Sequence, residues 1–260
     1  MTPPPSDEDA LAKRLAGQRI LVTGAPGDLG RAICLEVARA GADVVVHHWQ
    51  TPEAALRLSE QLTALGVDAS VIEADVSDPD QVGEAIRHLE EEHGPLTGLV
   101  NNAGIMDEQP FLATTIQSWQ KTLDVDLTGV FIVSQEVGGR MFGRGHGSIV
   151  NISSQLAFKG GMHVAAYCAA KAGVLGLTRA MARELGPQVR VNAVAPGPLE
   201  TAMTAPYADE AWLAVRTGPL VTGRLGLPTE VAPAVVFLLA AESALFHGQT
   251  LHPNGGGVMA

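Results

Sequence analysis

Short runs rich in β-branched residues alternate with longer amphipathic runs along almost the whole chain. Most of the short runs are apolar throughout, as in strands of a sheet that helices cover on both faces. This alternation predicts βαβ units around a parallel sheet rather than a sandwich or a helical bundle. Seven strands are expected, at residues 19–23, 43–48, 69–73, 98–101, 147–152, 189–193 and 250–252.

One domain is expected to hold all seven strands. A folded chain of 260 residues buries about 70% of the surface that its unfolded form exposes, which is ample for one core. No repeat, heptad pattern or low-complexity linker divides the sequence, so we predict a single domain over residues 17–260. Residues 1–16 are expected to form a flexible tail, because the chain begins with a proline-rich, acidic segment that lacks the features of a secretory signal.

The composition disfavours several classes of partner. With 46% hydrophobic and 17% charged residues the chain is that of a globular protein. A net charge of −11 would repel nucleic acid and anionic membranes, so neither is expected as a partner. The most apolar stretch, residues 231–246, contains Pro233 and Glu242 and is too short to span a membrane.

The cysteines and histidines predict neither a disulfide framework nor a metal site. Cys34 and Cys168 lie in helix-like apolar runs without the spacing of a zinc site or a disulfide-rich domain. The eight histidines do not form a HExxH or comparable set, so no metal is expected. Unpaired cysteines fit a reducing compartment, and a cytoplasmic location is expected.

A glycine-rich turn follows the first predicted strand. The segment from Gly24 to Gly30 joins that strand to a helix predicted over residues 31–40, and the second strand follows. Backbone N–H groups at the start of such a helix can approach a pyrophosphate. The order of strand, turn, helix and strand is that of dinucleotide-binding folds, so we expect a dinucleotide cofactor at this turn.

The end of the second predicted strand bears on the choice of cofactor. Dinucleotide folds commonly place a carboxylate there, which holds the ribose 2′-hydroxyl of NAD. This strand instead ends in His47, His48 and Trp49. A 2′-phosphate would not be repelled, so NADP(H) is favoured and NAD(H) is left open. No lysine or arginine stands there, and His48 is either a weak phosphate contact or a histidine facing solvent.

A tyrosine and a lysine four residues apart give the chain a candidate proton donor. Tyr167 and Lys171 fall on one face of a helix predicted over residues 167–185. A lysine ammonium near a phenol favours the phenolate and lowers the pKa of the phenol. Tyr167 would then act as a general acid or base near neutral pH. Ser154, just after the fifth predicted strand, adds a hydroxyl to this set.

Taken together, these motifs resemble the short-chain dehydrogenase/reductase family. The resemblance runs from about Arg19 to Gly257, nearly the whole chain. Its motif residues are Thr23, Gly24 and Gly30, Asp75, Asn101 to Gly104, Ser154, Tyr167, Lys171, Pro196, Gly197, Arg224 to Gly226, Gly248, Gln249, Gly255 and Gly256. Within the family the chain is most similar to 3-oxoacyl-acyl-carrier-protein reductases and related carbonyl reductases.

The resemblance implies both a fold and an activity. The fold is a Rossmann-type, doubly wound α/β domain with a seven-stranded parallel sheet and three layers, α/β/α. The activity is hydride transfer between NADP(H) and a ketone or secondary alcohol, as in a 3-oxoacyl reductase-like ketoreductase with a small-molecule carbonyl or alcohol substrate. Two alternatives stay open: an NAD-dependent sugar or secondary-alcohol dehydrogenase, and a non-catalytic dinucleotide-binding scaffold.

The resemblance also assigns roles to residues. Ser154 would hold the substrate oxygen, Tyr167 would deliver the proton, and Lys171 would lower the pKa of Tyr167 and bind the nicotinamide ribose. The expected cofactor contacts are Thr23, Gly24, Gly27, Asp28, Leu29, Gly30, His48, Asp75, Val76, Asn102, Ala103, Gly104, Tyr167, Lys171, Pro196, Gly197, Leu199 and Thr201.

Two residues depart from the family pattern. Asp28 stands at the middle glycine of the turn, where its carboxylate is expected to crowd the pyrophosphate and weaken cofactor binding without abolishing it. Asp126, which we include among the catalytic residues, stands where the family has an asparagine that holds a water linking Lys171 to solvent. An ionised aspartate cannot donate a hydrogen bond, so this water would turn around. Alternatively, Asp126 pairs with Lys171 and holds it protonated.

Two further expectations concern the substrate pocket and the oligomer. By the resemblance, residues 201–227 form a substrate lid, in which Met203, Tyr207, Trp212 and Leu220 either line an apolar pocket or simply pack onto the domain. The helices predicted near residues 117–141 and 167–185 are rich in apolar side chains beyond what one sheet face requires. In the family such surfaces join subunits, so a homotetramer is expected.

Overall fold

A computed structural model describes residues 13–202, 204–205 and 209–259. Within them, seven strands pair in parallel in the order β3-β2-β1-β4-β5-β6-β7, which confirms the predicted doubly wound sheet. The strands are β1 (Arg19–Val22), β2 (Asp43–His48), β3 (Ala69–Glu73), β4 (Gly98–Asn101), β5 (Gly147–Ile152), β6 (Val189–Val194) and β7 (Thr250–Leu251).

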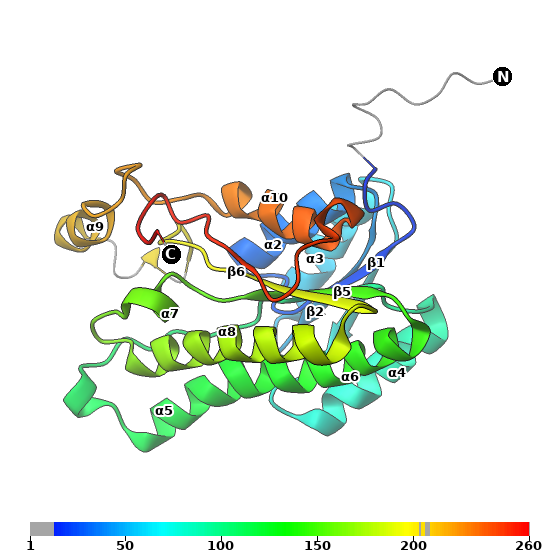
Figure 1. Ribbon diagram of the computed structural model, residues 1–260, viewed down its shortest axis with the longest axis horizontal. Coiled ribbons are helices and arrows are strands. Elements are labelled where there is room, and N and C mark those ends of the chain that lie inside the picture. The colour runs from blue at the N-terminus through cyan, green and yellow to red at the C-terminus, as the bar shows by residue number, and fades with distance from the viewer. Residues whose placement is uncertain (1–12, 203, 206–208, 260) are drawn as a thin grey trace.

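Helices cover both faces of this sheet and make the three predicted layers. Figure 1 shows α2, α3 and α10 on one face and α4, α6 and α8 on the other. The helices are α2 (Asp28–Arg39), α3 (Pro52–Thr63), α4 (Pro79–His93), α5 (Ile116–Leu123), α6 (Gly129–Arg144), α7 (Leu156–Lys159), α8 (Ala165–Leu185), α9 (Glu210–Thr217) and α10 (Pro228–Leu239). Short 3₁₀ turns lie at η1 (Phe111–Ala113) and η4 (Ala241–Ser243), and a π-helical turn, η2 (Asp124–Thr128), joins α5 to α6.

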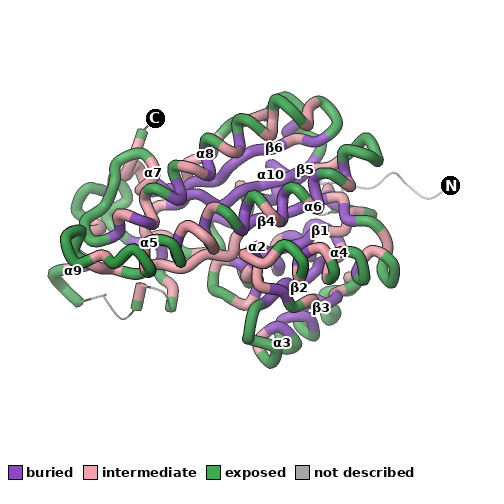
Figure 2. Tube along the Cα trace, turned by 90° about the horizontal axis from the view of Figure 1, so that it is seen from below, coloured by how far each residue is buried: buried purple, intermediate pink, exposed green. Residues whose placement is uncertain are grey.

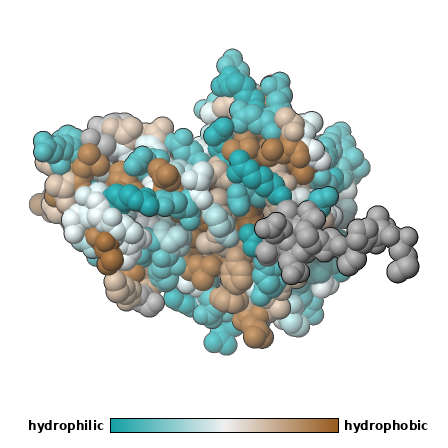
Figure 3. Space-filling model, turned by 90° about the horizontal axis from the view of Figure 1, so that it is seen from above, coloured by the Kyte–Doolittle hydropathy of each residue, from teal (hydrophilic) through white to brown (hydrophobic). Residues whose placement is uncertain are grey.

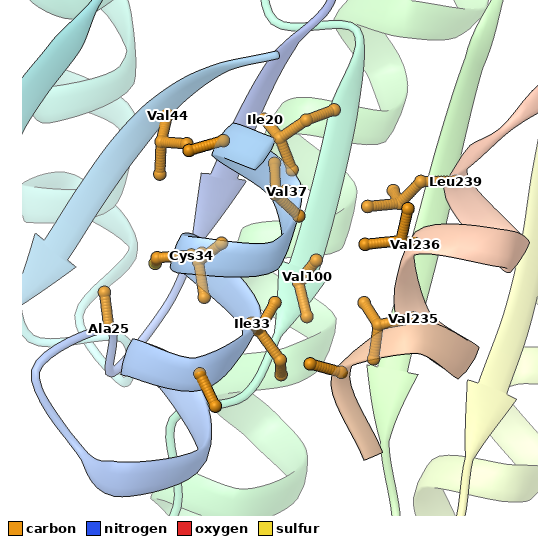
Figure 4. Close-up of a cluster of buried hydrophobic side chains, with 14 of the residues drawn as sticks. Ile20, Ala25, Ile33, Cys34, Val37, Val44, Val100, Val235, Val236 and Leu239 are labelled. Atoms are coloured by element: carbon orange, nitrogen blue, oxygen red, sulfur yellow. The ribbon is translucent and has the colours of Figure 1, made fainter. Parts of the chain in front are cut away.

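Each face of the sheet has its own apolar core. Neighbouring residues of a strand point to opposite faces, so Ile20 packs beneath α2 and α10 while Leu21 packs on the other side. Figure 4 shows Ile20 with Val37 of α2 and Val236 of α10 in the first of these clusters. The strands between the two edges of the sheet are therefore buried from both sides (Figure 2), which explains their nearly continuous apolar sequences.

The first described residues pack onto the domain. Leu15, which lies within the predicted N-terminal tail, is fully buried, and its N–H donates to the carbonyl of Ala40 at 2.9 Å. Leu15, although part of the predicted tail, therefore packs on the domain. The rest of the predicted tail, residues 1–12, lies outside the described residues.

The order of the strands reverses between β1 and β4, and this reversal creates the site. The chain leaves β1 toward β2 and β3, but leaves β4 toward β5, β6 and β7 on the other side. A crevice opens at such a point beyond the carboxyl ends of the strands. Seen from the side that α2 and α10 cover, the molecular surface mixes hydrophobic and hydrophilic side chains (Figure 3).

Candidate active site

A cavity of about 470 Å³ lies at this crevice and collects most of the predicted site residues. It is lined by Gly24, Gly27, Asp28, Leu29, Gly30, Asn102, Ala103, Gly104, Asp126, Ser154, Tyr167, Lys171, Pro196, Gly197, Leu199 and Thr201. Four expected cofactor contacts, Thr23, His48, Asp75 and Val76, are not part of its lining.

The turn after β1 can only be built with glycine at two positions. Gly24 has φ of +60°, and a Cβ there would lie 2.9 Å from Ala103 Cα. A Cβ on Gly30 would lie 2.5 Å from the carbonyl oxygen of Gly24. The turn thus lies directly against the loop after β4. Helix α2 begins behind it at Asp28, earlier than predicted, and its N-cap Gly27 supplies no side-chain acceptor. The first N–H groups of α2 therefore suit an anion such as a pyrophosphate.

Thr23 connects the glycine turn after β1 to the loop after β4 through hydrogen bonds. Its Oγ1 accepts hydrogen bonds from the N–H groups of Asn102 at 2.9 Å and Ala103 at 3.0 Å. In return, Asn102 Nδ2 donates to the carbonyl oxygens of Thr23 at 2.9 Å and Gly24 at 3.2 Å. Thr23 thus positions cavity residues rather than lining the cavity.

Asp28 connects the glycine turn to the loop that follows β6. Its Oδ2 accepts a hydrogen bond from the N–H of Ala202 at 2.6 Å, and both residues line the cavity. The carboxylate is exposed and stands in the first turn of α2, where the helix dipole favours a negative charge. The hydrogen bond between Asp28 and Ala202 therefore joins two parts of the cavity lining that lie far apart in the sequence.

The two histidines at the end of β2 are buried. His47 Nδ1 accepts from the N–H of Gly24 at 3.3 Å and its Nε2 donates to the carbonyl of Ala74 at 3.0 Å. Burial lowers the pKa of His47 to about 4, so the ring is neutral. His48 is only 4% exposed and its Nδ1 accepts from the N–H of Thr51 at 3.3 Å. The expectation that His48 faces solvent is therefore wrong, and it does not line the cavity either.

The cavity brings together Ser154 from the end of β5 with Tyr167 and Lys171 from α8. Tyr167 and Lys171 lie one helical turn apart, and Lys171 Nζ is 5.5 Å from the centroid of the Tyr167 ring. Ser154 Oγ accepts a hydrogen bond from the N–H of Leu156 at 3.1 Å. Lys171 is buried and donates to the carbonyl of Ile152 at 3.2 Å.

The pKa of Tyr167 is raised, opposite to the direction expected from the sequence. Burial of the phenol is the largest cause; Lys171 and the hydrogen bond with Ser154 lower the pKa, but they do not outweigh it. The negative charge of Asp126 raises it further. Tyr167 is therefore a protonated phenol at neutral pH, suited to donate a proton.

Asp126 makes a direct ion pair with Lys171. The π-helical turn η2 carries Asp126 into the interior, where it is 0% exposed. Its Oδ1 accepts from the N–H of Ile105 at 2.7 Å and its Oδ2 lies 3.1 Å from Lys171 Nζ. Burial lowers the pKa of Lys171, but Asp126 and Tyr167 together outweigh burial and the pKa is raised. Of the two alternatives at this position, the geometry therefore favours the ion pair.

Sequence reasoning missed several side chains at the far side of the cavity. Glu108, Gln155, Lys159 and Arg216 line it, together with Trp212 of the predicted lid. They come from three separate segments, and no spacing in the sequence links them. Met203 and Tyr207, also named for the pocket, lie outside the described residues, and Leu220 is buried without lining this cavity.

Neither a metal centre nor a membrane span is found in the described part of the chain. Residues 13–202, 204–205 and 209–259 contain no group of three or more histidine, cysteine or acidic side chains arranged to hold a metal ion. Within the same ranges, every helix is too short or too polar to cross a bilayer.

Comparisons with known proteins match nearly the whole chain. The family model described as enoyl-(acyl carrier protein) reductase matches residues 24–257. The chain is 38% identical over 237 residues to the 3-oxoacyl-(acyl-carrier-protein) reductase FabG of Staphylococcus aureus, covering 91% of this chain and 96% of that protein. It is 36% identical over 244 residues to the FabG of Aquifex aeolicus, covering 94% and 98%.

Solved structures agree with the architecture. A gluconate 5-dehydrogenase from Burkholderia cenocepacia, in complex with NADP and tartrate, has a TM-score of 0.90 at 34% identity and covers 95% of this chain and 98% of its own. A short-chain type dehydrogenase/reductase from Mycobacterium marinum has a TM-score of 0.90 at 32% identity, covering 96% and 99%.

Proposed function

The chain belongs to the short-chain dehydrogenase/reductase family, and from that premise we propose that it is an NADPH-dependent ketoreductase with Ser154, Tyr167 and Lys171 as its catalytic residues. It is an oxidoreductase that uses a nicotinamide dinucleotide and acts on CH–OH or C=O groups. The observation that carries the finer proposal is the meeting of these three side chains in the cavity that also contains the glycine turn.

The residues present fit a dinucleotide. The uncapped start of α2 would take the pyrophosphate, and Gly24, Gly27 and Gly30 line the cavity there without side chains that would cover the backbone. Asn102 to Gly104, Pro196, Gly197, Leu199 and Thr201 would line its path toward Tyr167. The bound nicotinamide supplies the hydride, and the protein supplies the proton.

The proton chemistry follows from the burial of Tyr167. Ser154 would donate a hydrogen bond to the carbonyl oxygen and hold it against the Tyr167 hydroxyl. As negative charge develops on that oxygen, Tyr167 would release its proton to it. A raised pKa keeps Tyr167 protonated at neutral pH, which favours reduction of a ketone over oxidation of an alcohol. Lys171, kept charged by Asp126, would stabilise the phenolate that is left.

Support for NADP(H) over NAD(H) comes from the end of β2. The strand itself ends in His47 and His48 rather than in an acidic residue, and the carboxylate beside it, Glu73 of β3, accepts a hydrogen bond from the N–H of Gln50 at 3.1 Å. A gluconate 5-dehydrogenase structure with NADP bound adds to this support. The same relative keeps a second candidate open, a sugar or secondary-alcohol dehydrogenase. A scaffold without turnover is less well supported, because the complete set of Ser154, Tyr167 and Lys171 is present.

The first experiment is a paired fluorescence titration with NADPH and NADH. We expect NADPH to bind more tightly, and NADH binding about tenfold tighter than NADPH would contradict the cofactor choice. Loss of absorbance at 340 nm with NADPH is then followed with a diketone, a 3-oxoacyl thioester and a 2-enoyl thioester. We expect reduction of the first two substrates. Turnover of the enoyl thioester alone would overturn the ketoreductase proposal.

The proposal includes a homotetramer and a cytoplasmic location. Phe131 and Phe142 on α6 are 46% and 43% exposed, which leaves aromatic surface on the helix layer that joins subunits in the family. The two cysteines are free thiols, as suits a reducing compartment. A monomeric mass by light scattering at micromolar concentration would contradict the tetramer.

A further inference from the structure

The cavity has a charged wall that the proposed hydride and proton transfer does not use. It is formed by Glu108 from the loop after β4, Lys159 from α7, and Trp212 and Arg216 from α9. Figure 1 shows α9 at the end of the molecule where α7 and the start of α8 also lie. Arg216 also acts on Cys168, the neighbour of Tyr167: its charge partly offsets the rise in the pKa of that thiol caused by burial. The wall lines the same cavity as Ser154 and Tyr167, the residues proposed to act on the carbonyl.

Arg216 is held in place but keeps hydrogen-bonding capacity. Its Nη2 lies 3.3 Å from Glu108 Oε1, and its guanidinium lies 5.1 Å from the centroid of the Trp212 ring. The side chains of Arg216 and Glu108 are only 22% and 13% exposed. A guanidinium has five N–H donors, and this contact with Glu108 uses one of them. The pair orients Arg216 and leaves donors for a ligand.

The wall carries net positive charge in an acidic chain. On this wall the two cations Lys159 and Arg216 stand with one anion, Glu108, whereas elsewhere in the lining Lys171 is paired with Asp126 and Asp28 lies at the glycine turn. Among the residues that the structure describes, Lys159 is in no ion pair, so Glu108 does not balance both cations. In a protein of net charge −11, this local excess is a specific feature rather than a general property of the surface.

An unsatisfied donor lies on the same wall. Trp212 Nε1 is buried and has no acceptor among the described residues. Buried indole N–H groups usually have a hydrogen-bond partner. Because Trp212 lies against Arg216 and lines the cavity, an acceptor bound there could contact both side chains. A carboxylate has the charge for Arg216 and the lone pairs for both.

We propose that Arg216 binds a carboxylate of the substrate, with Trp212 as a second donor, so that the ketone reduced here is an oxo acid. The proposal rests on the ketoreductase function and names its substrate class. It predicts that a free oxo acid is bound better than its ester, which keeps the carbonyl but lacks the charge. Arg216 then determines specificity, while Ser154 and Tyr167 act on the carbonyl.

The test compares levulinate with its methyl ester. The same comparison is made for the oxo acids one carbon shorter and one carbon longer, each against its own methyl ester. Binding is measured by calorimetry to the Tyr167→Phe variant loaded with NADP⁺, and kcat/KM is measured with NADPH in the wild-type protein. Each measurement is repeated with Arg216→Gln, Arg216→Lys and Arg57→Gln. Arg57 is the matched control, because it also pairs with a glutamate, Glu53 at 3.7 Å, but lies on α3 outside the cavity.

For at least one chain length we expect the acid to be preferred over its ester by about tenfold, as for a charge-assisted hydrogen bond. Arg216→Gln should remove the preference, Arg216→Lys should keep part of it, and Arg57→Gln should leave it unchanged. Equal or tighter binding of every ester, or a preference that survives Arg216→Gln, overturns the proposal. Preferred binding of the acid without any reduction would instead refute the ketoreductase function, and equal reduction of acid and ester would refute only the carboxylate site.

Discussion

Lys171 Nζ lies 3.1 Å from Asp126 Oδ2 in the interior of the protein, where neither side chain is more than 4% exposed. The other carboxylate oxygen of Asp126 accepts from the N–H of Ile105, so the acid is fixed from both sides. Burying two such charges is tolerated only when they are paired and hydrogen-bonded. The pair therefore keeps Lys171 charged beside Tyr167, and the charge of Asp126 acts on Tyr167 as well.

Asp126→Asn should move the alkaline limit of ketone reduction to lower pH. Reduction needs a protonated Tyr167, whose pKa is raised by burial and further by the charge of Asp126. The amide removes that charge and still accepts a hydrogen bond from Ile105. The measurement is kcat/KM against pH for both proteins, with Asp124→Asn on the same turn as the control. An alkaline limit that stays in place or rises would show that Asp126 does not act on Tyr167.

Tyr167→Phe should reduce the rate of ketone reduction by about 100-fold or more, because the variant lacks the proton donor. The ring and its contacts remain, so NADPH affinity should be largely kept. Steady-state kinetics and a fluorescence titration on the same preparation separate the two effects. A variant that reduces ketones at nearly the wild-type rate would remove Tyr167 from the mechanism.

The fold could be predicted because the patterns that specify it lie within short stretches of the sequence. A strand such as β1 is buried on both faces and so reads as a continuous apolar run. The spacing of Tyr167 and Lys171 likewise fixes their shared helix face before any tertiary contact forms. Gly24 and Gly30 mark a turn that other residues cannot build.

The rest of the site depends on tertiary packing. Asp126, which contacts Lys171, lies in a π-helical turn, and periodicity does not reveal such a turn. Burial raises the pKa of Tyr167, whereas the spacing of Tyr167 and Lys171 in the sequence reveals only the opposite effect, the lowering of this pKa by the lysine charge. Glu108, in the loop after β4, meets Arg216 of α9, which lies far away in the sequence. The sequence does not reveal that His48 is buried, with its Nδ1 accepting a hydrogen bond from the N–H of Thr51 rather than from solvent.

Asp28→Gly should tighten the binding of NADPH. The substitution removes a negative charge from the start of α2, where a pyrophosphate would lie, and frees the N–H of Ala202. Asp28→Asn separates these effects, because its amide oxygen can still accept from Ala202 without carrying a charge. If repulsion dominates, both variants should bind NADPH more tightly, as measured by fluorescence titration. Unchanged or weaker binding by Asp28→Gly would contradict the expected crowding.

His47 should make the fold sensitive to acid. Its pKa is about 4 in the folded protein against 6.5 as the ordinary value, because burial disfavours the charged ring. Between these values the unfolded chain binds a proton that the folded chain does not, so stability is lost as pH falls from 6.5 toward 4. Between about pH 7 and about pH 5 this amounts to about 2 kcal/mol of unfolding free energy.

The His47→Gln variant tests this contribution, since glutamine does not titrate and retains a donor and an acceptor. Urea unfolding at the two pH values gives the loss of stability for each protein, and the variant should lose about 2 kcal/mol less than the wild type. His88→Gln on α4 is the control, because that side chain is 56% exposed and its substitution should leave the pH dependence unchanged. An equal acid sensitivity of wild type and His47→Gln would mean that the ring is charged in the folded protein, which its burial between Gly24 and Ala74 opposes.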